Sequence, residues 1–210
     1  MLLELLHIAD SALPVGSAAH SYGLETLVEE GYLVPETVEA FLSDYLAEAG
    51  ALEASFVRRA WQGESPQSLS DEFAARRPAR ECREAALKTG RRFGHLVNAF
   101  LGGSKAIIPD GLYYPVAFGL AAAHLQIPES DAALAYLRQS IAGLVSACQR
   151  LMPVGQVEAS CIVWNLRRAI SAAASAGTTD SHRREVGCFT PLPDLASARH
   201  GFLETRLFIS

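Results

Sequence analysis

The sequence predicts an all-α protein, a single-domain bundle of about eight to ten helices with no sheet. Apolar residues recur at spacings of three and four along almost the whole chain, which is the period of a helix with one buried face. No segment shows the clean apolar–polar alternation of a half-buried strand bounded by turns. The length of 210 residues and the hydrophobic share of 50% suit one domain with its own core, expected to span residues 1–210.

Four helices are expected in the first part of the chain. The pattern places them at residues 2–9, 21–31, 35–61 and 66–77. Gly31 and the Val34–Pro35 step end the second helix, because the residue before a proline disfavours the helical conformation. Pro35 then begins the long third helix, and the polar residues 62–65 separate it from the fourth.

Five more helices are expected in the second part. They fall at residues 79–101, 114–126, 129–150 and 156–174, with a short last helix from 194 onward. Pro115 suits a first helical turn, where its missing N–H leaves no hydrogen bond unmade. Residues 177–193 are expected to form a polar loop, and residues 194–210 a C-terminal helix, capped by Asp194, and a tail.

The charge of the chain is unevenly distributed. The net charge is −5, but residues 1–72 hold 13 acidic residues and two arginines, whereas residues 73–210 hold 16 basic and 10 acidic residues. Nonspecific binding to nucleic acid needs a basic excess, so a nucleic-acid partner is not expected. Such polarity favours docking against a protein surface.

A cytoplasmic protein without membrane contact is expected. The longest apolar stretch, residues 113–127, is too short to span a bilayer and contains His124. The N-terminus does not read as a signal peptide, because Glu4, His7 and Asp10 interrupt its apolar run. The four cysteines show no short repeated spacing and suit free thiols in a reducing compartment: Cys82, Cys148, Cys161 and Cys188.

No constellation of residues predicts an enzyme, a metal site or a bound cofactor. No two histidines are three or four residues apart, so no helix face offers a pair of metal ligands. His182 and Cys188 share a loop, a pairing that more often reflects loop polarity than a metal site. Residues 102–105 have a glycine-rich start and a lysine, but no strand precedes them and Ala106 follows, so a phosphate-binding loop is rejected.

The first unusual cluster joins residues 11–17 to residues 20–25. Pro14 sets an extended turn, and Gly16 permits a positive φ angle that other residues avoid. One interpretation is a capped turn between helices, with Ser17 or Ser21 as the cap. The other is a surface that meets a partner, formed by Gly16, Ser17, His20, Tyr22 and Glu25.

Two further clusters lie at a helix break and at the end of the chain. The break consists of Arg150, Pro153, Gly155 and Gln156, with Gln156 as a candidate cap; we expect it to hold a turn between core helices, with partner contact as the alternative. The chain ends Arg206-Leu207-Phe208-Ile209-Ser210. An end this apolar must be buried on its own domain or in a partner.

These clusters resemble the UreF family of urease accessory proteins. The resemblance rests on Leu13-Pro14-Val15-Gly16 followed by Ser21-Tyr22-Gly23-Leu24-Glu25, on Tyr114-Pro115-Val116-Ala117-Phe118-Gly119, on Arg150-Leu151-Met152-Pro153-Val154-Gly155-Gln156, and on Arg206-Leu207-Phe208-x-Ser210. The motifs follow one another in the family's order and cover nearly the whole chain.

The resemblance implies a scaffold without chemistry of its own. It implies an all-α homodimer that bridges the accessory protein UreD (also named UreH) and the GTPase UreG, modulates the GTPase, and supports nickel insertion into apo-urease. Nickel would be handled by the complex, with no cofactor bound directly by this chain. The alternative is a stand-alone helical regulator that binds another protein and is unrelated to urease.

The resemblance also implies roles for two groups of residues. Arg206, Leu207, Phe208 and Ser210 are expected to order the tail against the UreD-like partner. The group Gly16, Ser17, His20, Tyr22 and Glu25 is expected to meet the GTPase or the second copy of the dimer, with packing inside the chain as an equally weighted alternative.

Overall fold

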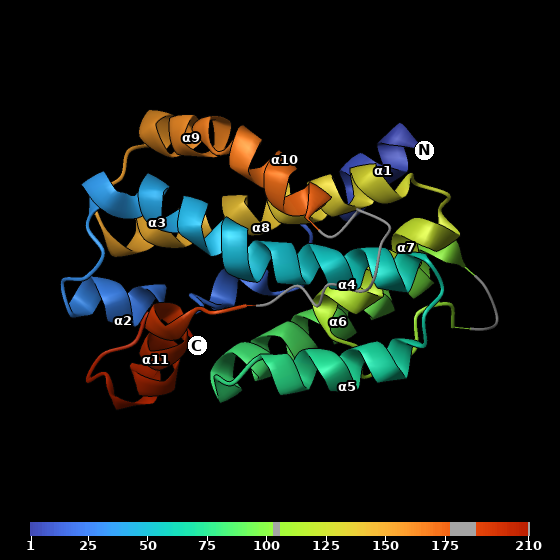
Figure 1. Cartoon of the computed structure of the whole chain (residues 1–210), viewed down its shortest axis with the longest axis horizontal. Helices are drawn as coiled ribbons and strands as arrows, with labels where there is room; N and C mark the ends of the chain where they lie inside the picture. The colour runs from blue at the N-terminus through green and yellow to red at the C-terminus, as the bar shows by residue number, and fades with distance from the viewer. Residues whose placement is uncertain (103–105, 177–187, 210) are drawn as a thin grey trace.

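The computed structural model describes residues 1–102, 106–176 and 188–209, and the regular elements of this part of the chain are all helices, with no strand (Figure 1). The predicted all-α fold is confirmed. Ser210, His182, most of the predicted loop 177–193 and residues 103–105 lie outside the described residues.

The first part of the chain forms five α-helices. They are α1 (Leu2–Ile8), α2 (Leu24–Glu29), α3 (Val38–Tyr45), α4 (Ala51–Trp61) and α5 (Pro66–Arg76). Short 3₁₀ turns precede two of them: η1 (Ser17–Ala19) before α2 and η2 (Pro35–Thr37) before α3. The π-helical turn η3 (Leu46–Gly50) joins α3 to α4, so the helix expected at 35–61 exists as one continuous rod.

The second part forms six α-helices. They are α6 (Arg80–Leu101), α7 (Tyr114–His124), α8 (Glu129–Leu151), α9 (Gln156–Asn165), α10 (Arg167–Ser175) and α11 (Pro191–Arg199), followed by the 3₁₀ turn η4 (His200–Phe202). Only Leu166 separates α9 from α10. With α3–α4 and α9–α10 each taken as one rod, the described residues form nine helical units, within the predicted range.

Two predicted helix boundaries are wrong. Helix α2 begins at Leu24, because Tyr22 and Gly23 adopt left-handed φ angles of 53° and 91° that interrupt a right-handed helix. Helix α11 begins at Pro191, three residues before the predicted cap Asp194. The carboxylate of Asp194 instead accepts a hydrogen bond of 2.9 Å from the Oγ1 hydroxyl of Thr190, at the N-cap position.

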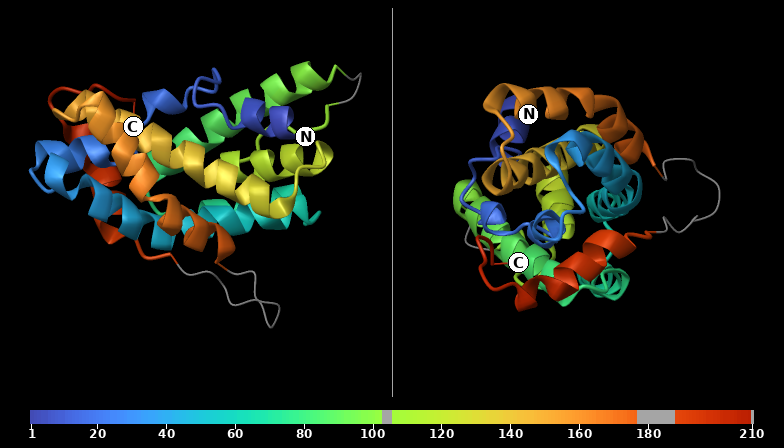
Figure 2. Two further views of the ribbon diagram at one scale, coloured as in Figure 1. Left: turned by 90° about the horizontal axis from the view of Figure 1, so that it is seen from above. Right: turned by 90° about the vertical axis from the view of Figure 1, so that its left-hand side faces the viewer.

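Helix α7 is the centre of the bundle. It packs against α4, α6 and α8, and all six residues from Tyr114 to Gly119 are buried. The end-on view in Figure 2 shows the other helices arranged around it. Since α7 is apolar on every side, it can be covered by several neighbours at once.

Two glycines allow close approach to this central segment. A methyl group at Gly119 in α7 would lie 2.2 Å from the carbonyl oxygen of Val57 in α4. A methyl group at Gly90 in α6 would lie 2.2 Å from the carbonyl oxygen of Leu112, just before α7. Both distances are far below contact distance, so glycine at these positions sets the spacing between backbones.

The C-terminal helix lies at one end of the molecule. Helix α11 packs against α2 and α6, and the chain ends beside it, whereas α1 lies at the opposite end (Figure 1). Segments near both ends of the sequence, α2 and α11, are therefore spatial neighbours. Among the described helices, none is both long enough and apolar enough to cross a membrane.

Replacing Gly119 with alanine tests the close approach of α7 to α4. We expect Gly119→Ala to lower the free energy of unfolding by about 1–3 kcal/mol, because the added methyl group must push two helices apart. Gly143→Ala is the matched control: this position lies inside α8 and a methyl group there meets nothing within 4 Å, so stability should stay level or rise by up to about 1 kcal/mol. Denaturant unfolding measures both, and equal stabilities would contradict the close approach.

Candidate functional site

The carboxylate of Glu25 binds the C-terminal tail to the body of the protein. Glu25 lies in the first turn of α2 and is buried. It accepts hydrogen bonds from the backbone N–H groups of Leu207 and Phe208, the latter at 3.1 Å. A buried carboxylate needs such donors, since leaving it unpaired carries a large desolvation cost.

His200 completes the set of partners around this carboxylate. Its Nε2 atom lies 2.7 Å from Oε2 of Glu25, and its Nδ1 atom lies 3.1 Å from Oε2 of Glu81 in α6, an ion-pair distance without hydrogen-bond alignment. The imidazole is completely buried between the two acids. A neutral imidazole has one N–H and can serve one of them, whereas the imidazolium has a donor for each.

Arg150 also holds the tail, through contacts with η1 and with the ring of Phe208. Its Nη1 atom donates a hydrogen bond of 2.6 Å to the carbonyl oxygen of Ala18 in η1, and its guanidinium lies 4.2 Å from the centre of the Phe208 ring. The N–H of Ile209 donates to the carbonyl oxygen of Ala19 at 2.9 Å. Three consecutive tail N–H groups, at 207–209, are thus bound by the segment 19–25.

The structure brings the three sequence clusters together in part. Glu25 from the first, Arg150 from the second and Leu207 and Phe208 from the third form one site. Four predicted residues lie on its outside or away from it and are exposed on the described surface: Pro14, Pro153, Gly155 and Gln156. Arg206 is also exposed, and Ser210 lies outside the described residues. Their contacts with a partner stay predictions.

Several local interpretations need correction. Neither serine caps α2: Gly23 occupies the N-cap position, and the buried Ser21 hydroxyl has no partner among the described residues. Gln156 is the first residue of α9, and Glu158 instead accepts a bond of 3.4 Å from the N–H of Gly155. Arg150 does not hold the turn that follows it, because its side chain reaches η1 and the tail.

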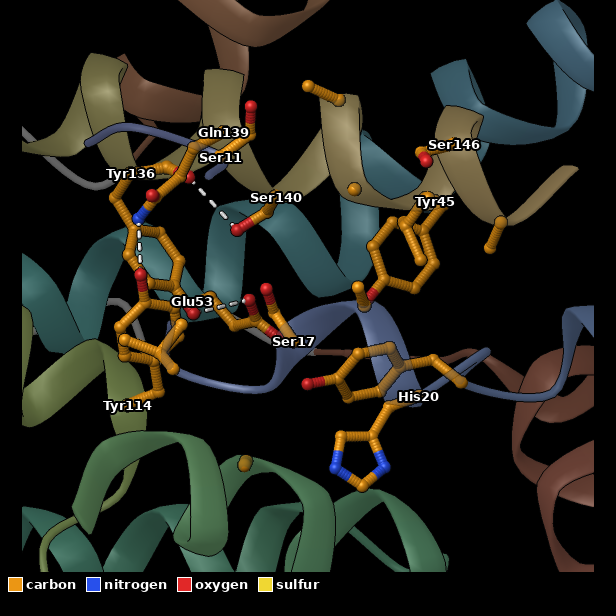
Figure 3. Close-up of a pocket in the computed structure, with 18 of the residues that line it drawn as sticks. Ser11, Ser17, His20, Tyr45, Glu53, Tyr114, Tyr136, Gln139, Ser140 and Ser146 are labelled. Atoms are coloured by element: carbon orange, nitrogen blue, oxygen red, sulfur yellow. Dashed lines mark hydrogen bonds between the residues drawn. The ribbon is translucent and has the colours of Figure 1, made fainter. Parts of the chain in front are cut away.

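The remaining residues of the first cluster face inward. Gly16 has the predicted positive φ angle, 79°, and the guanidinium of Arg92 occupies the space where a Cβ would stand. Burial and the nearby cations Lys88 and Arg92 lower the pKa of His20 to about 4, so its ring is neutral at pH 7. Ser17, His20 and Tyr22 line a cavity in the bundle (Figure 3).

Packing inside the chain therefore accounts for His20, Tyr22 and Glu25 in the isolated protein. Glu25 is buried because α2 is covered on two sides, by α8 and by α11. Whether these residues also meet a GTPase or a second copy stays a prediction.

Sequence reasoning missed three parts of the site. His200 and Glu81 had no spacing that marked them as partners of Glu25, because they lie far from it in the chain. Gly23 was noted only as part of a motif, yet a Cβ there would lie 2.7 Å from the carbonyl oxygen of Pro193 in α11. The signal that could have connected these residues with Glu25 is the combination of an acid and an apolar chain end, because a carboxylate that is buried needs hydrogen-bond donors.

The site shows no metal-binding geometry. Over the described ranges, no group of three or more His, Cys, Asp or Glu side chains converges as metal ligands would. Of the two acids around His200, Glu25 is engaged with N–H donors, whereas Oε2 of Glu81 has only the ion-pair contact with the ring. What the arrangement does chemically is to hold a peptide segment by its backbone.

The outer face of the tail is apolar and open. Phe208 is 5% exposed, whereas Leu207 and Ile209 on either side are 55% and 62% exposed. Exposed apolar side chains also occur on and beside α11: Phe189, Leu192, Leu195 and Phe202. We name these four residues with Leu207 and Ile209 the C-terminal apolar surface.

Glu25→Gln tests the anchoring of the tail. The amide offers one acceptor oxygen in place of two and turns an N–H donor toward a donor, so we expect the free energy of unfolding to fall by about 1–3 kcal/mol. Glu29→Gln on the exposed face of the same helix is the control and should change it by less than about 0.5 kcal/mol. Equal effects in thermal unfolding would show that Glu25 does not anchor the tail.

Known proteins resemble this chain over almost its full length. A family model described as UreF matches residues 34–167. Urease accessory protein UreF of Nostoc sp. (strain PCC 7120) is 32% identical over 222 residues, covering 99% of this chain and 95% of that protein. The same-named proteins of Cereibacter sphaeroides (strain ATCC 17029) and Granulibacter bethesdensis are each 33% identical, covering 99% and 100% of this chain and 97% and 94% of theirs. Since the match extends across both the bundle and the tail, the chain belongs to the UreF family.

Proposed function

We propose that this protein acts in urease maturation as a scaffold that bridges a UreD/UreH-like accessory protein and the GTPase UreG. In this role it modulates the GTPase and supports nickel insertion into apo-urease, with nickel as cargo of the complex. The scaffold is a homodimer in the cytoplasm. Family membership supports the role in urease maturation, because the relatives are named urease accessory proteins.

The C-terminal apolar surface is the single observation that carries the bridging role. Exposed apolar groups that gather in one region of a protein mark sites where another protein binds. Here six of them lie on α11 and on the segments that precede and follow it, at one end of the molecule (Figure 1). A UreD/UreH-like partner is the proposed occupant of this surface.

The residues beneath the tail hold it in one conformation before the partner binds. Glu25 and Arg150 fix the backbone and the Phe208 ring, which leaves Leu207 and Ile209 pointing outward. A segment already held in one conformation loses less conformational entropy on binding than a free chain end. In this proposal Leu207 and Ile209 are the anchors that enter the partner, and Phe208 is the anchor that enters the body.

The experiment is a binding measurement with the cognate UreD/UreH-like protein. We expect the double variant Leu207→Asp with Ile209→Asp to weaken the complex at least tenfold, because a charge would be buried in an apolar contact. Both side chains are more than half exposed, so the free protein should keep its thermal stability. Light scattering on a sizing column and titration calorimetry measure the assembly and its affinity.

Leu3→Asp is the matched control, because Leu3 is an exposed leucine on α1 at the opposite end of the molecule (Figure 1). It should leave this complex intact. Adding the GTPase to the wild-type complex should produce a larger assembly. Wild-type affinity in the double variant would refute the assignment of the tail, and a chain that binds neither protein would refute the scaffold.

A further inference from the structure

A cavity of about 190 Å³ enters the bundle next to the tail site. It opens between the segment after α1, η1 and α8, where Ser11, Ala18 and Arg150 are exposed. Apart from the exposed Asp10, its lining contains four tyrosines and one acid: Tyr22, Tyr45, Tyr114, Tyr136 and Glu53. Figure 3 shows Tyr45, Glu53 and Ser17 around the same space. A cavity of about 150 Å³ can hold a molecule the size of benzene, so this one has room for a ligand of a few heavy atoms. Arg150 stands at its mouth, and the exposed side chains of Leu207 and Ile209 do not line it.

Some of the hydrogen-bond acceptor positions of Glu53 already have partners. Oε1 of Glu53 pairs with the guanidinium of Arg77, and Oε2 accepts a hydrogen bond of 2.9 Å from the hydroxyl of Tyr136. A carboxylate offers about four acceptor positions, so acceptor capacity remains on the cavity side. Because Arg77 balances its charge, Glu53 presents an acceptor without presenting a net negative site.

Three of the four tyrosine hydroxyls keep an O–H that no described group accepts. Tyr136 donates to Glu53, and Tyr114 accepts a bond of 2.6 Å from Gln139 but donates to no described group. No described group hydrogen-bonds the hydroxyl of Tyr22 or of Tyr45 at all. Burial raises the pKa of both free phenols, so both stay protonated and able to donate. Both tyrosines are half-buried, and donors that face a cavity are ordinarily satisfied by water or by a bound ligand.

Two backbone irregularities bring these groups to the cavity. Residues eight apart in a straight α-helix point about 80° apart, but the extra residue of a π turn reduces this to about 20°. The π turn Leu46–Gly50 stands between Tyr45 and Glu53 and so aligns the two side chains. Tyr22 holds a left-handed φ of 53°, a conformation unusual for a bulky residue and common at ligand sites.

We propose that this cavity binds a small uncharged ligand of the amide class, whose carbonyl accepts from Tyr22 and Tyr45 and whose N–H group donates to Glu53. An anion such as a carboxylate has no N–H group to donate to Glu53, and a cation would compete with Arg77 for it. A planar amide supplies the acceptor and the donor that the wall lacks, and its flat faces suit aromatic side chains. The assignment stands apart from the bridging role and does not depend on it.

The test uses three probes of nearly equal size and shape that differ in charge: acetamide, acetate and acetamidinium. Amide chemical shifts of the full chain are followed by nuclear magnetic resonance at pH 7 during each titration. We expect acetamide to bind saturably at millimolar concentration, because so small a ligand makes few contacts, and the two ions to bind at least tenfold more weakly. Tighter binding of either ion, or no saturable binding of acetamide, would overturn the proposal.

Three variants place the binding in this cavity. Tyr45→Phe removes one donor without changing the volume and should weaken acetamide about tenfold. Tyr32→Phe, at an exposed tyrosine away from the cavity lining, should leave the affinity unchanged. Gly143→Leu adds a side chain where the cavity wall is open and should abolish binding while the protein stays folded. Wild-type affinity in both Tyr45→Phe and Gly143→Leu would refute this location.

Discussion

The arrangement of this end of the molecule depends on the burial of one carboxylate, that of Glu25. No lysine or arginine in the described part of the chain pairs with it, so its partners are His200 and the backbone of the tail. The hydrogen bonds to the carboxylate of Glu25 hold α11, η4 and residues 207–209 against α2. Interactions between positions 175 to 183 residues apart thereby fix where residues 207–209 lie and which of their side chains face outward.

The fold was largely predictable because helix packing repeats locally. The spacing of apolar residues locates the rods, and Pro66, Pro115 and the Gly155 break mark real boundaries. The departures have local backbone causes that spacing does not encode. Tyr22 in a left-handed conformation shortens α2, and the π turn at Leu46–Gly50 leaves the apolar pattern of its rod nearly unchanged.

The site was predictable only in pieces. The motifs singled out Glu25, Arg150 and Phe208, but no local pattern shows that they meet, because these residues are far apart in the sequence. His200 and Glu81 could not be recognised as site residues for the same reason. Glu53 could not be singled out either, because it is one acid on a mostly apolar helix. Family resemblance supplied the proposed partners, whereas coordinates were needed to show that Phe208 turns inward while Leu207 and Ile209 turn outward.

The most direct test of this account is amide hydrogen exchange in the isolated protein at Leu207, Phe208 and Ile209. Their N–H groups are bound to Glu25 and Ala19, so the account predicts exchange at least about a hundredfold slower than in an unfolded peptide. It also predicts protection at these three residues before any partner is added. Exchange at the rate of a free chain end would show that the tail is not held by Glu25, and would contradict the account.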